Sequence, residues 1–310
     1  VYVGRLPADE PGEAQFLVQR IIDYETNPPP GEWTRRLLFL GGTVAADNVT
    51  KEVEYHGGFP EDRIRKSGII PPGMRITALY DDESQWPPRY HLPLGVSFEP
   101  HFRLGYNEVE VEWSSGYFGV NANSHGGVSS LAAGANIPDW RQYWIYYLDV
   151  NSNLNNQGML PITFAFACLS GGFDCVNSTC CPTGNSLGEH LLLLQSGGSI
   201  AYIGSTRVAY GYGGSYSDFP ESSLDYHFWK NLFERTRIGE AFYEAKEDFS
   251  EWYSYPSEYE WEKTFLIFNL LGDPALNVKS KLCCLWSTPR LEGKASPRTA
   301  CSEEESAEFQ

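Results

Sequence analysis

The chain has 310 residues, of which 42% are hydrophobic and 15% aromatic, and this is ample for a packed core. Its formal net charge of −17 argues against binding to nucleic acid or to anionic membrane surfaces, because both require basic patches. No apolar run approaches the ~20 residues of a membrane-spanning helix. The chain opens at Val1 without an initiator methionine, so we expect an N-terminally truncated fragment whose targeting segment lies upstream.

The first part of the chain predicts alternating strands and helices. A strand at VYVGRL precedes an amphipathic helix that starts at about Asp9 and ends at NPPPGEW, because proline removes backbone donors and fixes φ. Two further strands are predicted at RLLFLGG and at MRITALY, which begins at Met74. The segments that follow them are predicted to be a polar loop, TVAADNVTKEVEYHGG, and an irregular surface connection, QWPPRYHLPLG.

The rest of the chain continues this alternation. Buried strands are predicted at YFGVNAN, at ITFAFA and at SIAYIGS, with a packed aromatic segment, DWRQYWIYYL, after the first. The helix SLGEHLLLLQ is predicted to be capped by Asn185 or Ser186. Three more helices, LDYHFWKNLFER, IGEAFYEAKEDF and EWEKTFLIFNL, precede a short last strand, PALNV. This pattern predicts an α/β fold with a mostly parallel sheet and helices on both faces.

Two reactive side chains stand just past the ends of predicted buried strands. His125 follows the strand YFGVNAN, in the stretch NANSHGG, and Cys168 follows the strand ITFAFA, in the stretch FACLSGG. The carboxyl ends of neighbouring parallel strands meet at one edge of an α/β sheet, where such folds place their sites. We therefore predict a catalytic dyad of Cys168 and His125. The alternatives are a core histidine bonded to a carbonyl and an inert buried thiol.

The chemistry of a cysteine nucleophile indicates further residues. A thiol attacks as thiolate, so the nearby histidine either raises the thiolate fraction or protonates the leaving amine. The tetrahedral oxyanion needs donors, and the backbone N–H groups of Gly126 and Cys168 are the natural pair, since glycine permits close approach. The other histidines, including His56 in the predicted polar loop, are interpreted as structural or surface residues.

The seven cysteines include a cluster that follows the predicted nucleophile. A small disulfide-closed loop from Cys175 to either Cys180 or Cys181 is the favoured interpretation, and it would suit an oxidising compartment. No spacing matches the paired CxxC of a structural zinc site.

Seven stretches follow one another along nearly the whole chain: YVGRLPA with a helix ending in IIDYE, AADN, SHGG, FACLSGGF, SIAYIGSTR, RIGEAFYEA and LLGDPALNV. In this order they resemble the gingipain-type cysteine peptidases, peptidase family C25, which are relatives of caspases and legumains. The resemblance implies a caspase-like three-layer sandwich and an endopeptidase that uses Cys168 and His125. On this basis residues 1–280 are expected to form the catalytic domain and residues 281–310 a polar C-terminal tail.

The resemblance also implies a substrate pocket and a setting. The loop after the second strand offers Asp47 and Glu52 to select a basic residue, and Tyr210 offers an aromatic wall. Asp47 would otherwise only cap its loop. No cofactor is required, although calcium could bind at DDES, Asp81 to Ser84, or around Asp47. Location outside the cell or on its surface, a propeptide and further domains are expected from the family.

One departure keeps other functions open. Members of the family carry an acidic residue just before the stretch that corresponds to AADN, where it orients the histidine, and this chain has LFLGGTVAADN with no acid upstream. A catalytically silent scaffold that binds partners is therefore one alternative. A transpeptidase, which passes the same acyl-enzyme to an amine, is the other.

Overall fold

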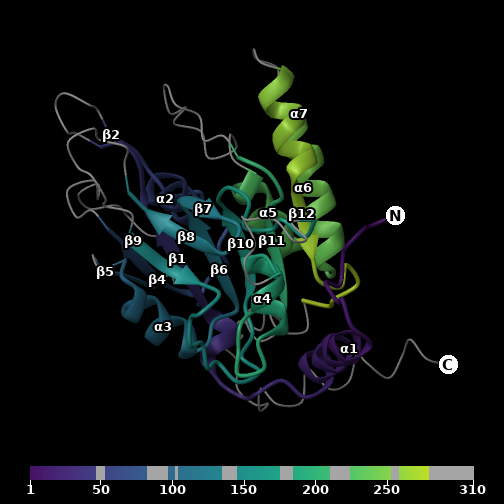
Figure 1. Cartoon of the computed structure of the whole chain (residues 1–310). Coiled ribbons are helices and arrows are strands. Elements are labelled where there is room, and N and C mark those ends of the chain that lie inside the picture. The colour runs from purple at the N-terminus through teal and green to yellow at the C-terminus, as the bar shows by residue number, and fades with distance from the viewer. Residues whose placement is uncertain are drawn as a thin grey trace, which may run out of the picture.

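The computed structural model describes residues 1–46, 53–81, 97–101, 104–134, 145–174, 184–209, 224–252 and 258–278. A seven-stranded sheet runs through the middle of the molecule (Figure 1) in the order β12-β11-β10-β6-β1-β4-β5. Every neighbouring pair is parallel except β11 with β12. The bounds of these strands are β1 Arg36–Gly41, β4 Arg75–Tyr80, β5 Ser97–His101, β6 Gly119–Asn123, β10 Ile162–Phe166, β11 Ala201–Ser205 and β12 Phe268–Leu271.

Helices cover both faces of this sheet. The residues are α1 Pro11–Thr26, α2 Gly58–Lys66, α3 Tyr106–Ser114, α4 Leu187–Leu193, α5 Leu224–Glu234, α6 Ile238–Trp252 and α7 Glu258–Ile267, with a 3₁₀ turn at Glu32–Arg35. One apolar core joins the sheet to α2, α5 and α6, and a second joins it to α3 and α4. The mostly parallel α/β sandwich expected from the sequence is thereby confirmed.

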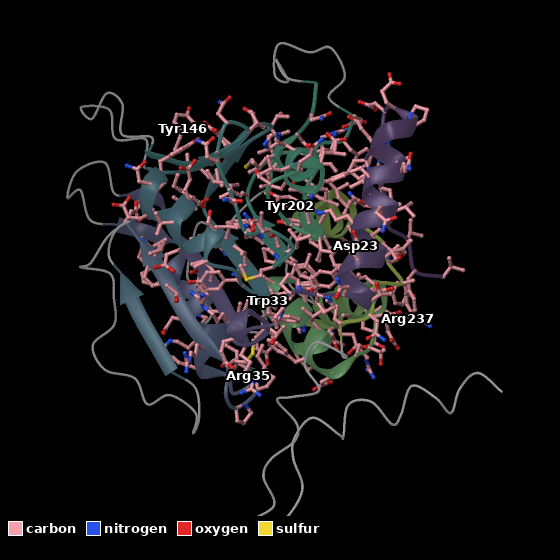
Figure 2. The ribbon with its side chains drawn as sticks, turned by 90° about the horizontal axis from the view of Figure 1, so that it is seen from below. Asp23, Trp33, Arg35, Tyr146, Tyr202 and Arg237 are labelled. Carbon is pink, nitrogen blue, oxygen red and sulfur yellow. The ribbon has the colours of Figure 1, made fainter. Side chains whose placement is uncertain are left out.

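Helix α1 lies below the sheet in Figure 1 and contributes to both cores, with Tyr24 in one and Leu17 in the other. Its neighbour Trp33 is buried, and its indole Nε1 donates to the carbonyl of Pro29 at 2.7 Å. Seen from below in Figure 2, Trp33 and Tyr202 lie well inside the outline of the molecule. None of the described helices combines the length and apolar character needed to cross a bilayer.

Two small antiparallel sheets lie beside the main one. The first pairs β2 (Thr43–Ala46) with β3 (Val53–His56), and the second has the order β7-β8-β9, at His125–Gly127, Ser130–Ala133 and Ile145–Asp149. The β2–β3 pair corrects the sequence prediction, which treated this stretch as a polar loop. Four residues such as TVAA, two of which are alanine, give a weak strand signal, and pairing with a partner strand decides the conformation.

The predictions also fail at the two ends of the chain. Residues 1–6 contribute only an isolated bridge between Arg5 and Leu271, and PALNV only one between Asn277 and Arg237. The last strand is instead FNLL, from Phe268, which the sequence assigned to a helix. A short apolar run cannot be told apart as helix or strand from periodicity alone. Elsewhere the predicted cap of α4 is confirmed at Ser186, which forms a reciprocal capping box with Glu189.

A buried polar network fixes β6 to α5 under the sheet. The indole of Trp229 donates to Asn121 Oδ1 at 2.9 Å, and Asn121 Nδ2 donates to Asp225 Oδ2 at 3.1 Å. Burial raises the pKa of Asp225 to about 6, although bonds from Asn121 and from the Tyr226 backbone oppose the shift. The folded state therefore binds the proton of Asp225 more tightly than the unfolded state does.

This raised pKa predicts the direction of a pH effect on stability. The stabilisation from protonated Asp225 is fully present below the unfolded pKa of about 4 and is lost as the pH rises through about 6. In Asp225→Asn this loss is absent, so its unfolding free energy relative to wild type should rise between pH 4 and pH 7.5, by roughly 1–3 kcal/mol. Urea unfolding across this range measures the difference.

The matched control for that experiment is Asp174→Asn. The Arg207 guanidinium holds the pKa of Asp174 below its usual value, so this variant should run parallel to wild type above pH 5. If the unfolding free energies of Asp225→Asn and wild type changed with pH in parallel, this would contradict the raised pKa of Asp225.

Candidate active site

The two predicted catalytic residues follow neighbouring strands at one edge of the sheet. Strands β6 and β10 pair in parallel, with Asn123 opposite Phe166 at the end of the ladder. His125 and Cys168 each lie two residues beyond these partners, and Ser124 N donates to the carbonyl of Phe166 at 3.3 Å. Both residues are half-buried. They therefore lie at the same rim, and neither is sealed in the core.

The backbones of the two motifs are in direct contact. A Cβ atom added at Gly126 would lie 2.5 Å from the carbonyl oxygen of Cys168 and 3.0 Å from its backbone nitrogen. It would also lie 2.8 Å from the Cβ of Ala167. Only glycine allows β7 to approach the cysteine loop this closely. The structure thus brings Gly126 and Cys168, the two predicted oxyanion donors, side by side.

The imidazole of His125 is held by the backbone. Its Nε2 lies 2.8 Å from the carbonyl oxygen of Val44 in β2, and the backbone of Gly134 also faces the ring. A carbonyl can only accept, so Nε2 carries a hydrogen and Nδ1 carries the lone pair of the neutral ring. Burial lowers the pKa of His125, and the hydrogen bonds to the backbone of Val44 and Gly134 offset part of this decrease. The ring is therefore neutral at pH 7.

The thiol of Cys168 is also protonated at neutral pH. Burial raises its pKa, and the positive charge of Lys263 opposes this only in part. Its Sγ lies 3.4 Å from the carbonyl oxygen of Ala209, beyond the end of β11. A resting thiolate and imidazolium pair is not favoured by these pKa shifts.

The turn after Cys168 is unusual. Leu169 has a φ of +61°, which side chains other than glycine rarely adopt. Two backbone bonds hold this turn against the end of β11, from Leu169 N to Arg207 O and from Gly171 N to Ser205 O, each at 3.0 Å. The strained turn directs the chain away from the strand immediately after the cysteine, so the thiol stays at the rim.

Some predicted site residues lie outside the described part of the chain. Asp47 and Glu52 fall between the end of β2 and the start of β3, and Tyr210 follows Ala209. Cys175, Cys180 and Cys181 fall outside as well, so the predicted disulfide is not tested. Conversely, the carbonyls of Val44 and Ala209 were missed, because a backbone group at the site leaves no signal in residue type.

Asp81, one of the residues expected to bind calcium, is hydrogen-bonded within the protein. Asp81 is the one described residue of the DDES stretch, and its Oδ1 accepts bonds from His56 Nε2 and from both the backbone nitrogen and the hydroxyl of Thr43. This oxygen thus already accepts hydrogen bonds from His56 and Thr43. Within the described ranges, no group of three or more histidine, cysteine or acidic side chains is arranged to hold a metal ion.

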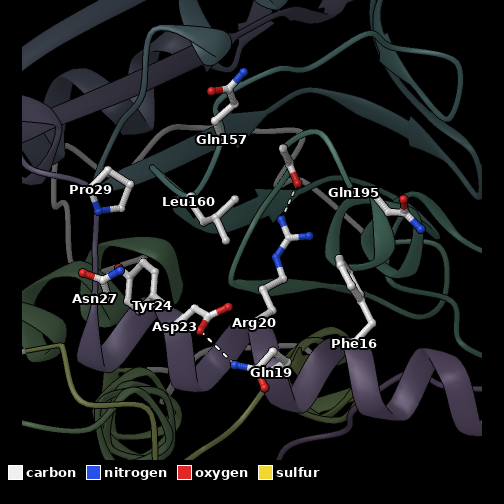
Figure 3. Close-up of a pocket in the computed structure, with 12 residues that line it drawn as sticks. Phe16, Gln19, Arg20, Asp23, Tyr24, Asn27, Pro29, Gln157, Leu160 and Gln195 are labelled. Atoms are coloured by element: carbon white, nitrogen blue, oxygen red, sulfur yellow. Dashed lines mark hydrogen bonds between the residues drawn. The ribbon is translucent and has the colours of Figure 1, made fainter.

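A pocket of about 440 Å³ lies elsewhere, between α1 and the loops that precede β10 and β11 (Figure 3). Arg20 enters it from α1 and donates to the carbonyl of Leu194 at 2.8 Å and to that of Gly197. Leu160 and Gly158, which also line it, stand before the start of β10. The pocket is therefore at the opposite edge of the sheet from Cys168 and is no part of this site.

Comparison with known proteins identifies the family of the chain. The model of peptidase family C25 matches residues 1–279. The chain belongs to this family. No curated protein matches it at the sequence level.

Solved structures of C25 peptidases share the fold of the chain. The crystal structure of the Arg-specific cysteine proteinase gingipain R superposes with a TM-score of 0.59 at 16% identity, covering 89% of this chain and 55% of that one. A complex of Porphyromonas gingivalis RgpB pro- and mature domains gives 0.58 at 17% identity, with 89% and 56% covered. The present C25 chain thus spans about half the length of these relatives.

The contact between Gly126 and Cys168 predicts unequal effects at two adjacent glycines. Gly126→Ala places a methyl group against the Cys168 backbone and displaces the donors at this point, whereas at Gly127 the nearest atom to an added Cβ is Ser130 Oγ at an ordinary 3.5 Å. Peptide turnover should fall about 100-fold in Gly126→Ala, the usual cost of one misplaced oxyanion donor. Gly127→Ala is the matched control and should stay within about threefold. Equal losses would contradict the assigned close approach.

Proposed function

We propose that this C25 chain is a cysteine endopeptidase in which Cys168 is the nucleophile and His125 the acid and base. The observation that carries the proposal is the register of β6 with β10, which sets Gly126 against Cys168 at the rim where His125 also lies. Half-buried, uncharged reactive groups at an open sheet edge suit a site that a peptide enters.

The chemistry follows from the resting protonation states. The thiol proton passes to Nδ1 of His125 as sulfur attacks the peptide carbonyl, and the C=O electron pair moves to oxygen. The N–H groups of Gly126 and Cys168 stabilise that oxyanion. When the tetrahedral intermediate collapses, the C–N bond breaks and the imidazolium gives its proton to the leaving amine. Water, deprotonated by the same ring, then cleaves the thioester and restores the thiol.

The lack of an acid upstream of AADN does not argue for a silent scaffold. The carbonyl of Val44 already accepts the Nε2 hydrogen at 2.8 Å, and its partial negative charge stabilises the ring when it becomes an imidazolium. This supports an active dyad with a backbone acceptor in the place of a side-chain carboxylate.

The expected substrate is a peptide with a basic residue before the cleaved bond. Asp47 follows Val44 by three residues, a span of at most about 10 Å, and Tyr210 directly follows Ala209, whose carbonyl contacts the thiol. These sequence positions support a role for Asp47 and Tyr210 in the substrate pocket, and Glu52 belongs to the same connection as Asp47. A carboxylate there would bind arginine or lysine through charge-assisted hydrogen bonds. The solved relative named above is described as Arg-specific.

The setting of the chain is proposed on the basis of its family. We propose that it lies outside the cell or on its surface, and that a propeptide and further domains belong to the same protein. One solved relative is a complex of pro- and mature domains, which supports this expectation. Calcium remains a proposed ligand for acidic residues outside the described ranges, and assays should therefore be run with and without it.

A fluorogenic peptide panel ending in Arg, Lys, Asn or Asp tests the proposal. We expect turnover after Arg or Lys, and a fall of at least about 10³-fold in Cys168→Ala and in His125→Ala, because the two residues act as one unit. His190→Ala, a half-buried histidine in α4, is the control and should retain activity.

Three outcomes separate the alternatives. Equal turnover by wild type and Cys168→Ala would remove the assigned nucleophile. A folded wild type that neither cleaves any peptide nor reacts with a peptidyl acyloxymethyl ketone would favour the scaffold. Products joined to an added amine, in preference to hydrolysis, would identify a transpeptidase.

A further inference from the structure

His56 and Asp81 form a histidine–carboxylate pair at the same sheet edge as the proposed dyad. Asp81 directly follows β4, and its Oδ1 lies 2.7 Å from Nε2 of His56, the last residue of β3. Both side chains are largely buried, at 10% and 2% exposed. The sequence suggested a loop position for His56, but it is a strand residue enclosed by the rings of Phe59 and Tyr80.

The tautomer of His56 is set by its two partners. Nδ1 accepts a hydrogen bond from the backbone nitrogen of Gly58 at 2.9 Å, so this nitrogen carries no hydrogen. The hydrogen of the ring therefore sits on Nε2 and is donated to Asp81. A histidine held at both nitrogens fixes its carboxylate partner in one orientation.

Asp81 in turn fixes the start of β2. Its Oδ1 also accepts from the backbone nitrogen of Thr43 at 2.9 Å and from the Thr43 hydroxyl at 3.2 Å. The carbonyl of Thr43 accepts from Gly134 N at 2.8 Å. Thr43 is thus held on both sides, and the next residue is Val44, whose carbonyl binds His125 Nε2.

We propose that Asp81 and His56 are positioning residues for His125 that act through the Thr43–Val44 backbone. They hold the Val44 carbonyl that accepts from Nε2 of His125, and so favour the tautomer whose hydrogen is on Nε2 and whose lone pair is on Nδ1. They thereby support the backbone carbonyl that stands in the place of a side-chain carboxylate in this chain. The kinetic part of this inference rests on the proposed peptidase function, whereas the tautomer part does not.

The conservative variant separates positioning from charge. In Asp81→Asn the Oδ1 atom remains and still accepts from Thr43 and His56, whereas Asp81→Ala removes it. We expect kcat to fall about 10–100-fold in Asp81→Ala with KM within about twofold, since misplacement of a catalytic group by about 1 Å has this effect. Asp81→Asn should stay within about fivefold of wild type. The double variant Asp81→Ala/His56→Ala should be no worse than the poorer single variant, because the pair acts as one unit.

Nuclear magnetic resonance of ¹⁵N-labelled histidine reads the tautomer without any substrate. Wild type and Asp81→Asn should show His125 protonated at Nε2 at pH 8, and Asp81→Ala should show a mixture of tautomers. The control is Asp62→Ala, which breaks a buried contact with Arg65 and Lys66 in α2. It should lower stability and leave both the tautomer and kcat per folded molecule unchanged.

The outcomes distinguish the two proposals. An Asp81→Ala variant whose His125 tautomer and kcat match wild type would overturn the positioning role. A wild type without peptidase activity, in which Asp81→Ala still alters the tautomer, would refute the proposed function and leave the positioning role standing.

Discussion

The parallel ladder between β6 and β10 is the constraint from which the geometry of the site follows. Its register pairs Asn123 with Phe166, and the two chains leave the sheet together. A shift of one residue would separate Gly126 from Cys168 and turn alternate side chains to the other face. The network of Asn121, Trp229 and Asp225 fixes β6 from below, so a buried polar cluster supports the placement of groups at the rim.

Burial then decides the charges at that rim. It lowers the pKa of His125 and raises the pKa of Cys168, so the resting site is neutral although the chain carries a formal charge of −17. Backbone carbonyls from β2 and from beyond β11 take the hydrogen bonds of the two groups. In the proposed mechanism the thiol therefore gives its proton to His125 only as it attacks a bound peptide.

The sequence predicts the main elements of this C25 fold because buried strands and amphipathic helices follow apolar periodicity. Cys168 and His125 could be proposed because each follows a buried strand and precedes glycine or small residues. The β2–β3 pair could not be predicted, since a short strand of small residues is stabilised by its partner more than by its own propensity. The proposed roles of Val44 and His56 could not be predicted for a related reason. Every residue has a backbone carbonyl, so the sequence does not distinguish that of Val44. The partner of His56 is Asp81, which lies beside it only in the folded chain.

We propose that His125 and Cys168 serve one peptide-binding site at the carboxyl edge of β6 and β10. A crystal structure of the protein treated with a peptidyl ketone inhibitor ending in arginine tests this most directly. The account predicts a covalent bond to Cys168 Sγ, the inhibitor oxygen facing the N–H groups of Gly126 and Cys168, and the His125 ring in contact with the same ligand. An adduct on any other residue, or one at Cys168 that the His125 ring does not touch, would contradict it.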